Sequence, residues 1–321
     1  MNVRALGLAI VAAVAAGSWV LTCLAWRLDH VSSGVLPLET RRFERFTLVT
    51  LGTAAAAEDH NRRGTAIAAG MGEDLVVVDA GRGLAEALRA AEIPVDQPAA
   101  LLITSLLPEN TVGLDDWLAA AWLAGRREPL RVIGPPGSRA LAEAARAGVT
   151  PGVVARARAL GEDDAPPALE VEEVDGAWSG SQGSLSLRAA TLPDGPAPTL
   201  AWRIEAEGRS AAIGGFGWGG EALQELARGA DILFHDAAYV PSPAEAREHE
   251  LDVSPERLER EAALFTEFDE VGALARRAGV DALVLVRLRQ PPVLDMQITG
   301  EIDDHFEGRI AVARDGDEFA P

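Results

Sequence analysis

The chain has 321 residues and is acidic, with 49 Asp and Glu residues against 29 basic ones and a net charge of −20. Every basic residue is Arg, because the sequence contains no Lys. An acidic surface repels phosphate backbones, so the composition argues against nucleic acid as a partner. The 48% of apolar residues can form a substantial core, and with one cysteine, disulfides do not indicate a compartment.

The chain begins with an apolar segment, Ala5–Trp26, which contains no charged residue and lies between Arg4 and Arg27. As a helix it would be long enough to cross a bilayer, and its apolar stretch is longer than that of a cleaved signal peptide. Cys23 follows Thr22, which fits a lipoprotein box poorly. We therefore predict a membrane anchor in residues 1–28, a polar tether in residues 29–45 and one globular domain in residues 46–321.

In chain order, the alternation and clustering of apolar residues in this domain predict strands that alternate with helices. Gly125 and Gly148 are interpreted as helix stops, and residues 163–167 as a loop. Strands are predicted at 46–52, 65–70, 74–79, 99–104, 130–133, 168–174, 184–191, 199–205, 209–214, 231–235 and 282–287, and helices at 82–92, 113–125, 137–147, 220–228, 254–263 and 268–278.

Seven segments along this domain carry recognisable patterns. They are Phe46–Thr53 (FTLVTLGT), Arg62–Thr65 (RRGT), Leu75–Gly83 (LVVVDAGRG), Ala99–Asn110, Leu200–Gly215, Glu221–Asp236 and Val271–Leu288. Together, and in this order, they resemble the metallo-β-lactamase fold superfamily in its ribonuclease Z and arylsulfatase-like branch. The resemblance implies an α/β fold, a four-layer αββα sandwich whose site lies at the sheet edges between the two halves. Together with the apolar segment, the prediction is such a sandwich preceded by one N-terminal transmembrane helix.

In that branch, the segment corresponding to residues 103–110 reads Leu-Thr-His-x-His-x-Asp-His and holds two zinc ions. The family's metal-ligand positions correspond here to Ser105, Leu107, Glu109, Asn110, Asp194, Gly215 and Arg287. Phe265 stands where the branch has a further His that is often tied to catalysis. The resemblance therefore predicts a site whose scaffold is present and whose metal ligands have been replaced.

Zinc requires imidazole, thiolate or carboxylate donors at about 2.0–2.3 Å. Leu107 and Gly215 offer no donor, and Arg287 places a fixed positive charge where a dication would bind. The five histidines are His30, His60, His235, His249 and His305, and no two of them form an H-x-H pair. We therefore predict that the protein has no cofactor, no metal and no catalytic residue, and is a pseudoenzyme that binds or scaffolds.

Two alternatives remain open at this point. The first is a working metal-dependent hydrolase, similar to phosphodiesterases, sulfatases or esterases, with a site rebuilt from Glu109, Asp194, His235 and Asp236. The second is nucleotide binding through Gly215–Gly220, which satisfies G-x-G-x-x-G between a strand and a helix. Such a fingerprint normally stands at the first strand-to-helix turn of its domain, and here most of the chain precedes it.

The altered site has two interpretations. A candidate ligand pocket would be formed by Ser105, Trp218, His235, Asp236, Phe265 and Arg287, with Arg287 binding a carboxylate or phosphate. Alternatively, the pocket has collapsed and Arg287 pairs with a carboxylate such as Glu109 or Asp194, and we favour this reading narrowly. A second copy of the chain or an active paralogue is an expected partner. Exported arylsulfatase-like relatives favour an extracytoplasmic domain, whereas Arg41, Arg42 and Arg45 favour the cytoplasmic side.

Overall fold

The structure is a computed structural model that describes residues 14–27, 37–55, 61–193, 197–215, 217, 219–238, 241–250, 252–262, 265–288 and 295–321. The chain divides into two compact units, Met1–Glu39 and Thr40–Pro321. In the first unit, residues 14–27 form a helix. Its large apolar side chains, such as those of Trp19, Leu21 and Trp26, are exposed.

The predicted transmembrane helix is wrong. Within the residues that the structure describes, no helix is both long enough and apolar enough to cross a membrane. The described helix begins at residue 14, and residues 5–13 of the predicted span lie outside the described residues. The predicted membrane-anchored, extracytoplasmic location depended on that span and is corrected with it.

The second unit is built on two seven-stranded sheets. The first sheet has the order β14-β1-β2-β3-β4-β5-β6, and the second has the order β13-β12-β11-β10-β9-β8-β7. The first contains β1 (Phe43–Gly52), β2 (Ala66–Gly72), β3 (Asp74–Val78), β4 (Ala100–Leu102), β5 (Leu130–Gly134), β6 (Leu169–Glu173) and β14 (Glu318–Phe319). The second contains β7 (Trp178–Gln182), β8 (Leu185–Leu192), β9 (Thr199–Ala206), β10 (Arg209–Ile213), β11 (Ile232–Asp236), β12 (Ala282–Val286) and β13 (Arg309–Val312).

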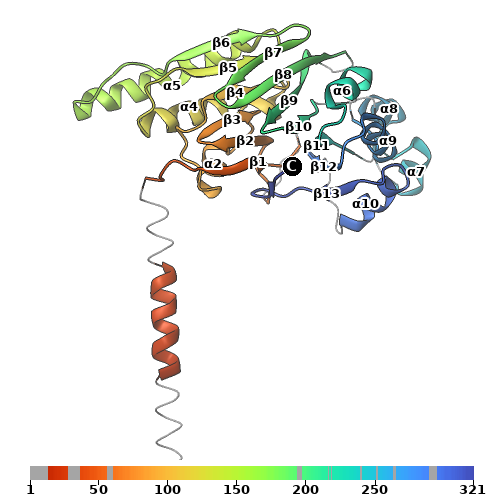
Figure 1. The fold of residues 1–321 in the computed structure, drawn as a ribbon, viewed down its shortest axis with the longest axis horizontal. Helices are drawn as coiled ribbons and strands as arrows, with labels where there is room; N and C mark the ends of the chain where they lie inside the picture. Colours follow the sequence, from red (N-terminus) through yellow and green to blue (C-terminus); the bar gives the residue numbers. More distant parts are fainter. Residues whose placement is uncertain are drawn as a thin grey trace, which may run out of the picture. The chain divides into compact units, whose positions relative to one another are not determined.

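Helices cover the outer face of each sheet (Figure 1). The described helices of this unit are α2 (Leu84–Ala90), α3 (Pro108–Thr111), α4 (Leu114–Leu123), α5 (Ser138–Leu160), α6 (Gly220–Ala227), α7 (Pro243–Glu248), α8 (Pro255–Ala262), α9 (Phe268–Ala278) and α10 (Asp295–Asp303). Helices α7 and α8 pack against each other in a separate small cluster. One buried cluster lies between the sheets and includes Phe46, Trp202 and Phe234. A second joins the first sheet to α2 and α4, and a third joins the other sheet to α6 and α9. The predicted αββα sandwich is confirmed.

Helix α5 differs most from the prediction, because it continues through Gly148 and Pro151 to Leu160. Its far end is held by a separate small cluster in which Val153 and Ala157 pack against Trp122. Trp122 also donates a hydrogen bond from Nε1 to the backbone oxygen of Ala165 at 2.8 Å. This packing outweighs the weak helix propensities of glycine and proline.

The strand directions determine where the site can form. Strands β3, β4 and β5 are parallel neighbours in the first sheet, and β10, β11 and β12 are parallel neighbours in the second. Loops at the carboxyl ends of parallel strands meet at one edge of a sheet. Two bridges join these loops across the sheets, Ser105 with Thr199 and Ala54 with Leu288. Chemistry-bearing side chains from both halves therefore converge between the sheets.

Candidate functional site: the former metal centre

The structure brings most of the family's metal-ligand positions to this convergence. Ser105 follows β4, and Leu107 precedes α3, the short helix that carries Glu109 and Asn110. Gly215 follows β10, and Arg287 follows β12. Asp194 and Trp218 lie outside the described residues. Ser105, Asn110 and Arg287 are buried, whereas Leu107 and Glu109 are partly exposed.

Arg287 occupies the centre of the site, with only 2% of its surface exposed. Its Nη2 donates to the backbone oxygens of Gly214 at 2.6 Å and Gly215 at 3.0 Å. Its Nη1 lies 3.5 Å from Oδ2 of Asp79, at the outer limit of a hydrogen bond. The two side chains are therefore held together mainly by the attraction of their charges in a buried environment, and less by a hydrogen bond.

Asp79 is the carboxylate that faces this guanidinium, and it is also buried. Its Oδ1 accepts the backbone N–H of Thr104 at 2.8 Å, and its Oδ2 accepts the Thr104 hydroxyl at 2.8 Å. Burial raises the pKa of Asp79 to about 6, against the opposing effects of the Arg287 charge and the Thr104 hydrogen bonds. Asp79 is therefore ionised at neutral pH, at a cost in desolvation that Arg287 only partly offsets.

Asn110 links the remaining polar groups of the loop after β4. Its Nδ2 donates to Oγ1 of Thr104 at 2.7 Å and to Oγ of Ser105 at 3.0 Å. Thr104 thus connects Asn110 to Asp79, and Asp79 connects both to Arg287. The side chains at three of the family's ligand positions, Ser105, Asn110 and Arg287, therefore belong to one hydrogen-bond network.

The residues present do not fit a zinc centre. Among the described residues, no group of three or more His, Cys, Asp or Glu side chains could hold a metal ion. There is also no space for a side chain at Gly215, which is one of the family's metal-ligand positions. A Cβ at Gly215 would lie 2.3 Å from Cγ2 of Thr199 and 2.9 Å from the backbone oxygen of Leu200. Within the described residues, a three-donor group and the space for a side chain at Gly215 are therefore both missing.

His235 and Asp236 end β11 and are completely buried. Nδ1 of His235 lies 2.6 Å from the backbone oxygen of Asp236 and 3.0 Å from its Oδ1. Nε2 of His235 has no hydrogen-bond partner within the described part of the chain. Phe265 is half-buried and packs near Ala246 and Leu258, which belong to α7 and α8. The six residues of the candidate pocket thus comprise four buried side chains, Phe265 and the undescribed Trp218.

Local packing and backbone geometry explain the glycines of the Gly215–Gly220 loop. The crowding at Gly215 recurs at Gly219, where a Cβ would lie 2.4 Å from Cβ of Leu223. Gly217 and Gly220 adopt φ values of 85° and 51°, which favour glycine. Packing and backbone geometry account for this motif without a nucleotide.

Sequence reasoning expected a carboxylate such as Glu109 or Asp194 as the partner of Arg287. The structure shows Asp79 facing it, and Asp194 lies outside the described residues. Thr104 was not singled out either, although it orients that carboxylate. A signal was available, because a buried arginine at a strand end needs a buried carboxylate. Asp79 directly follows the apolar strand Leu75–Val78.

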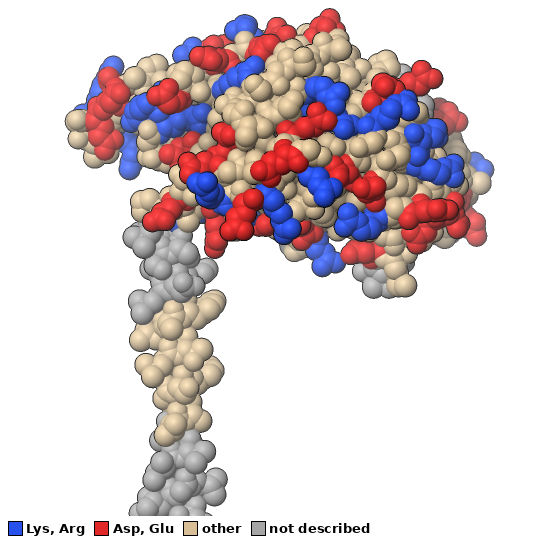
Figure 2. Space-filling view, in the orientation of Figure 1, with Lys and Arg blue, Asp and Glu red and all other residues tan. Residues whose placement is uncertain are grey.

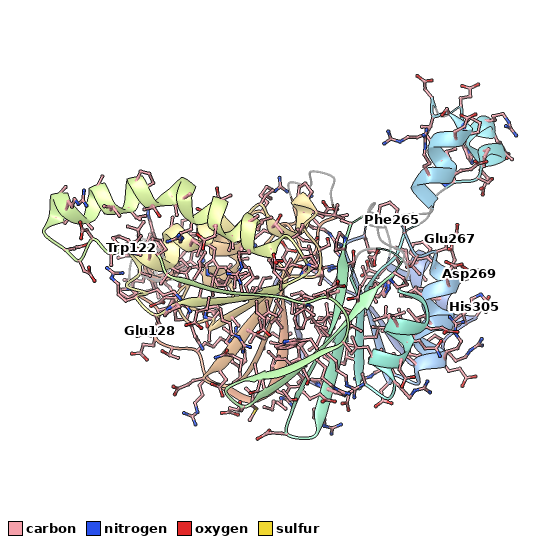
Figure 3. All side chains as sticks on the ribbon, turned by 90° about the horizontal axis from the view of Figure 1, so that it is seen from above. Trp122, Glu128, Phe265, Glu267, Asp269 and His305 are labelled. Carbon is pink, nitrogen blue, oxygen red and sulfur yellow. The ribbon has the colours of Figure 1, made fainter. Side chains whose placement is uncertain are left out.

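A separate hollow of about 550 Å³ lies among α7, α8, α9 and α10. Its lining includes Glu245, Glu259, Glu267, Asp269, Glu301, Asp304 and His305, and none of the described former ligand positions lines it. Figure 3 shows Glu267, Asp269 and His305 near one another at one end of the domain, with Trp122 at the other end. Burial and the neighbouring Asp269 and Glu270 raise the pKa of Glu267.

Comparison with known proteins decides the family. No family model matches the chain. A ribonuclease Z from Mycolicibacterium paratuberculosis is 31% identical over 241 residues, covering 73% of this chain and 83% of that protein. A ribonuclease Z from Mycobacterium bovis is 27% identical over 274 residues, which cover 84% of this chain and 95% of that protein. The chain belongs to the ribonuclease Z family.

Solved structures agree with this assignment at the level of the fold. The metallo-β-lactamase fold protein YhfI from Bacillus subtilis superposes with a TM-score of 0.65 at 13% identity, covering 86% of this chain and 99% of that one. Human tRNase Z, short form, gives a TM-score of 0.60 at 16% identity, and the match covers 85% of this chain and 98% of that one. This member of the ribonuclease Z family therefore has the complete fold with an arginine at the centre of its site.

Proposed function

We propose that this ribonuclease Z family member is a pseudoenzyme that binds or scaffolds a partner and does not hydrolyse phosphodiesters. The observation that carries the proposal is the position of Arg287. Its guanidinium is buried, donates from Nη2 to two backbone carbonyls and faces Asp79 with Nη1. A permanent cation there repels a dication, because arginine is not deprotonated in proteins.

The charge of the domain supports a partner other than RNA. The net charge is −20. On the face shown in Figure 2, arginines lie interspersed with aspartates and glutamates and form no separate basic patch. Phosphate backbones are bound by concentrated positive charge. We propose that the partner is a protein, either a second copy of this chain or an active paralogue.

The test is metal analysis of the full chain purified without chelator, together with cleavage assays. We expect substoichiometric zinc, manganese and iron, and no hydrolysis of precursor tRNA or of bis(p-nitrophenyl) phosphate with added Zn²⁺ or Mn²⁺. One or more tightly bound metal ions per chain would overturn the proposal.

A metal-dependent hydrolase with a rebuilt site is the second candidate. Membership of the ribonuclease Z family favours it, and so does one buried atom, Nε2 of His235, which has no hydrogen-bond partner among the described residues. If it were correct, bound metal and hydrolysis would both be lost in His235→Ala and retained in Arg287→Lys.

A further inference from the structure

Arg287 and Asp79 belong to different halves of the domain. Asp79 follows β3 of the first sheet, and Arg287 follows β12 of the second. Both are non-glycine residues with positive φ, 62° at Asp79 and 53° at Arg287. L-residues adopt this conformation at a cost, and they keep it only where surrounding contacts impose it.

Contacts at Arg287 do impose it, and they come from both halves. Its backbone N–H donates to the oxygen of Thr53 in the first half at 3.1 Å. Its guanidinium bonds to Gly214 and Gly215 in the second half and faces Asp79 in the first. One residue therefore holds loops that follow β1, β3 and β10.

The charges of the pair explain why these contacts depend on one another. Asp79 and Arg287 are each no more than 2% exposed, so water screens neither charge. If the Arg287 charge were removed at pH 8, the ionised Asp79 would be buried without a cation, and such a loss is more damaging than the loss of the pair. The two residues should therefore behave as one unit.

We infer that Asp79 and Arg287 form an inter-sheet ion pair that takes over the structural cross-linking of a metal centre and fixes the two halves in register without metal. The inference rests on the proposed absence of metal.

The experiment is a double-mutant cycle in the full chain at pH 8, with the thermal midpoint, Tm, as the readout. We expect Arg287→Met to lower Tm by roughly 10 °C in the wild-type background. In the Asp79→Asn background, the same change should lower Tm by clearly less. Equal effects of Arg287→Met in the two backgrounds would overturn the inter-sheet ion pair.

Arg203 offers a matched control. It is also buried, pairs with Glu205 and donates to the backbone oxygens of Leu226 and Arg228, all within the second half. Arg203→Met should lower Tm by the same amount with and without Asp79→Asn. Coupling of Arg203 to Asp79 would show that the cycle reports general destabilisation and would overturn the assignment.

Arg287→Lys covers the case in which Arg287→Met does not fold. Lysine keeps the charge but cannot reproduce the planar fork that spans two carbonyls and a carboxylate. We expect a folded protein with a Tm below that of the wild type, and a wild-type Tm would overturn the inference. Metal content of the same wild-type sample separates the two ideas. Bound metal defeats the proposed function, whereas a metal-free protein without coupling defeats only the ion pair.

Discussion

Trp202 donates a hydrogen bond from Nε1 to the backbone oxygen of Ile103 at 3.2 Å, and this bond connects the two sheets. Trp202 belongs to β9, and Ile103 is the residue after β4. The backbone N–H of Leu200 donates to the oxygen of Thr104 at 2.7 Å nearby. The loop that presents Thr104 and Ser105 is thus held from the opposite sheet by direct hydrogen bonds.

Replacing Trp202 with Phe should free this loop. The substitution removes the donor, leaves the oxygen of Ile103 buried and should cost about 1–3 kcal/mol in the free energy of unfolding. Amide hydrogen exchange across residues 104–111 should become faster. Trp117→Phe is the control, because Nε1 of Trp117 donates to the oxygen of Val95 within the first half. It should lower stability similarly without changing exchange in that loop, and equal exchange in both variants would contradict the prediction.

The pH dependence of stability should carry the signature of Asp79. Its pKa in the folded state, about 6, is raised above the ordinary value of 3.8 for an aspartate side chain. Its contribution to stability is therefore fully present below about pH 4 and lost as pH rises through 6. Between pH 7 and pH 4 the wild type should gain on the order of 3 kcal/mol relative to Asp79→Asn. Urea denaturation of both proteins across this range checks it, and parallel pH profiles would refute it.

A side chain at Gly215 should be costly whatever its chemistry. The space that a Cβ at Gly215 would occupy is taken by the side chain of Thr199 and the backbone oxygen of Leu200. Gly215→Ala and Gly215→Asp should each lose about 1–3 kcal/mol in unfolding free energy, the usual cost of overpacking. Neither should bind zinc in equilibrium dialysis. A stable Gly215→Asp protein that binds zinc would show that the centre can be rebuilt.

Gly148 should tolerate alanine and gain from it. It lies inside α5, and a Cβ there would meet nothing within 4 Å. Alanine should raise the unfolding free energy by about 0.5–1 kcal/mol, because glycine is unfavourable in a helix interior. Gly72→Ala is the contrast, since φ is 61° at Gly72 and alanine would be strained there. A loss of stability at Gly148 would argue against a continuous α5.

Sequence reasoning predicted most strands of the two sheets because apolar alternation and the family patterns pointed to the same segments. It missed β7, with the sequence WSGSQ, because this edge strand has no apolar alternation. It ended the helix that corresponds to α5 at residue 147, because Gly148 and Pro151 are local signals for the end of a helix. The packing of Val153 on Trp122 is a tertiary effect that such signals cannot contain.

The site shows the same division. Because Ser105, Leu107 and Asn110 are close in the sequence, sequence reasoning placed them in one loop. It could not pair Arg287 with Asp79, because 208 residues separate them and only the meeting of the two sheets brings them together. The predicted membrane span failed for another reason. Composition suggested a membrane span over residues 5–26, whereas no helix within the described residues is long and apolar enough to cross a membrane.

The crowding at Gly215 also bears on the history of the molecule. A return to an ancestral metal centre would need a carboxylate at Gly215, an imidazole at Arg287 and further donors in the loop after β4. Taken singly, the first collides with Thr199, and the second removes the guanidinium that faces the buried Asp79. On the proposed function, each substitution alone would lower stability before a metal could bind. The residues at positions 215 and 287 therefore oppose the stepwise recovery of a zinc centre.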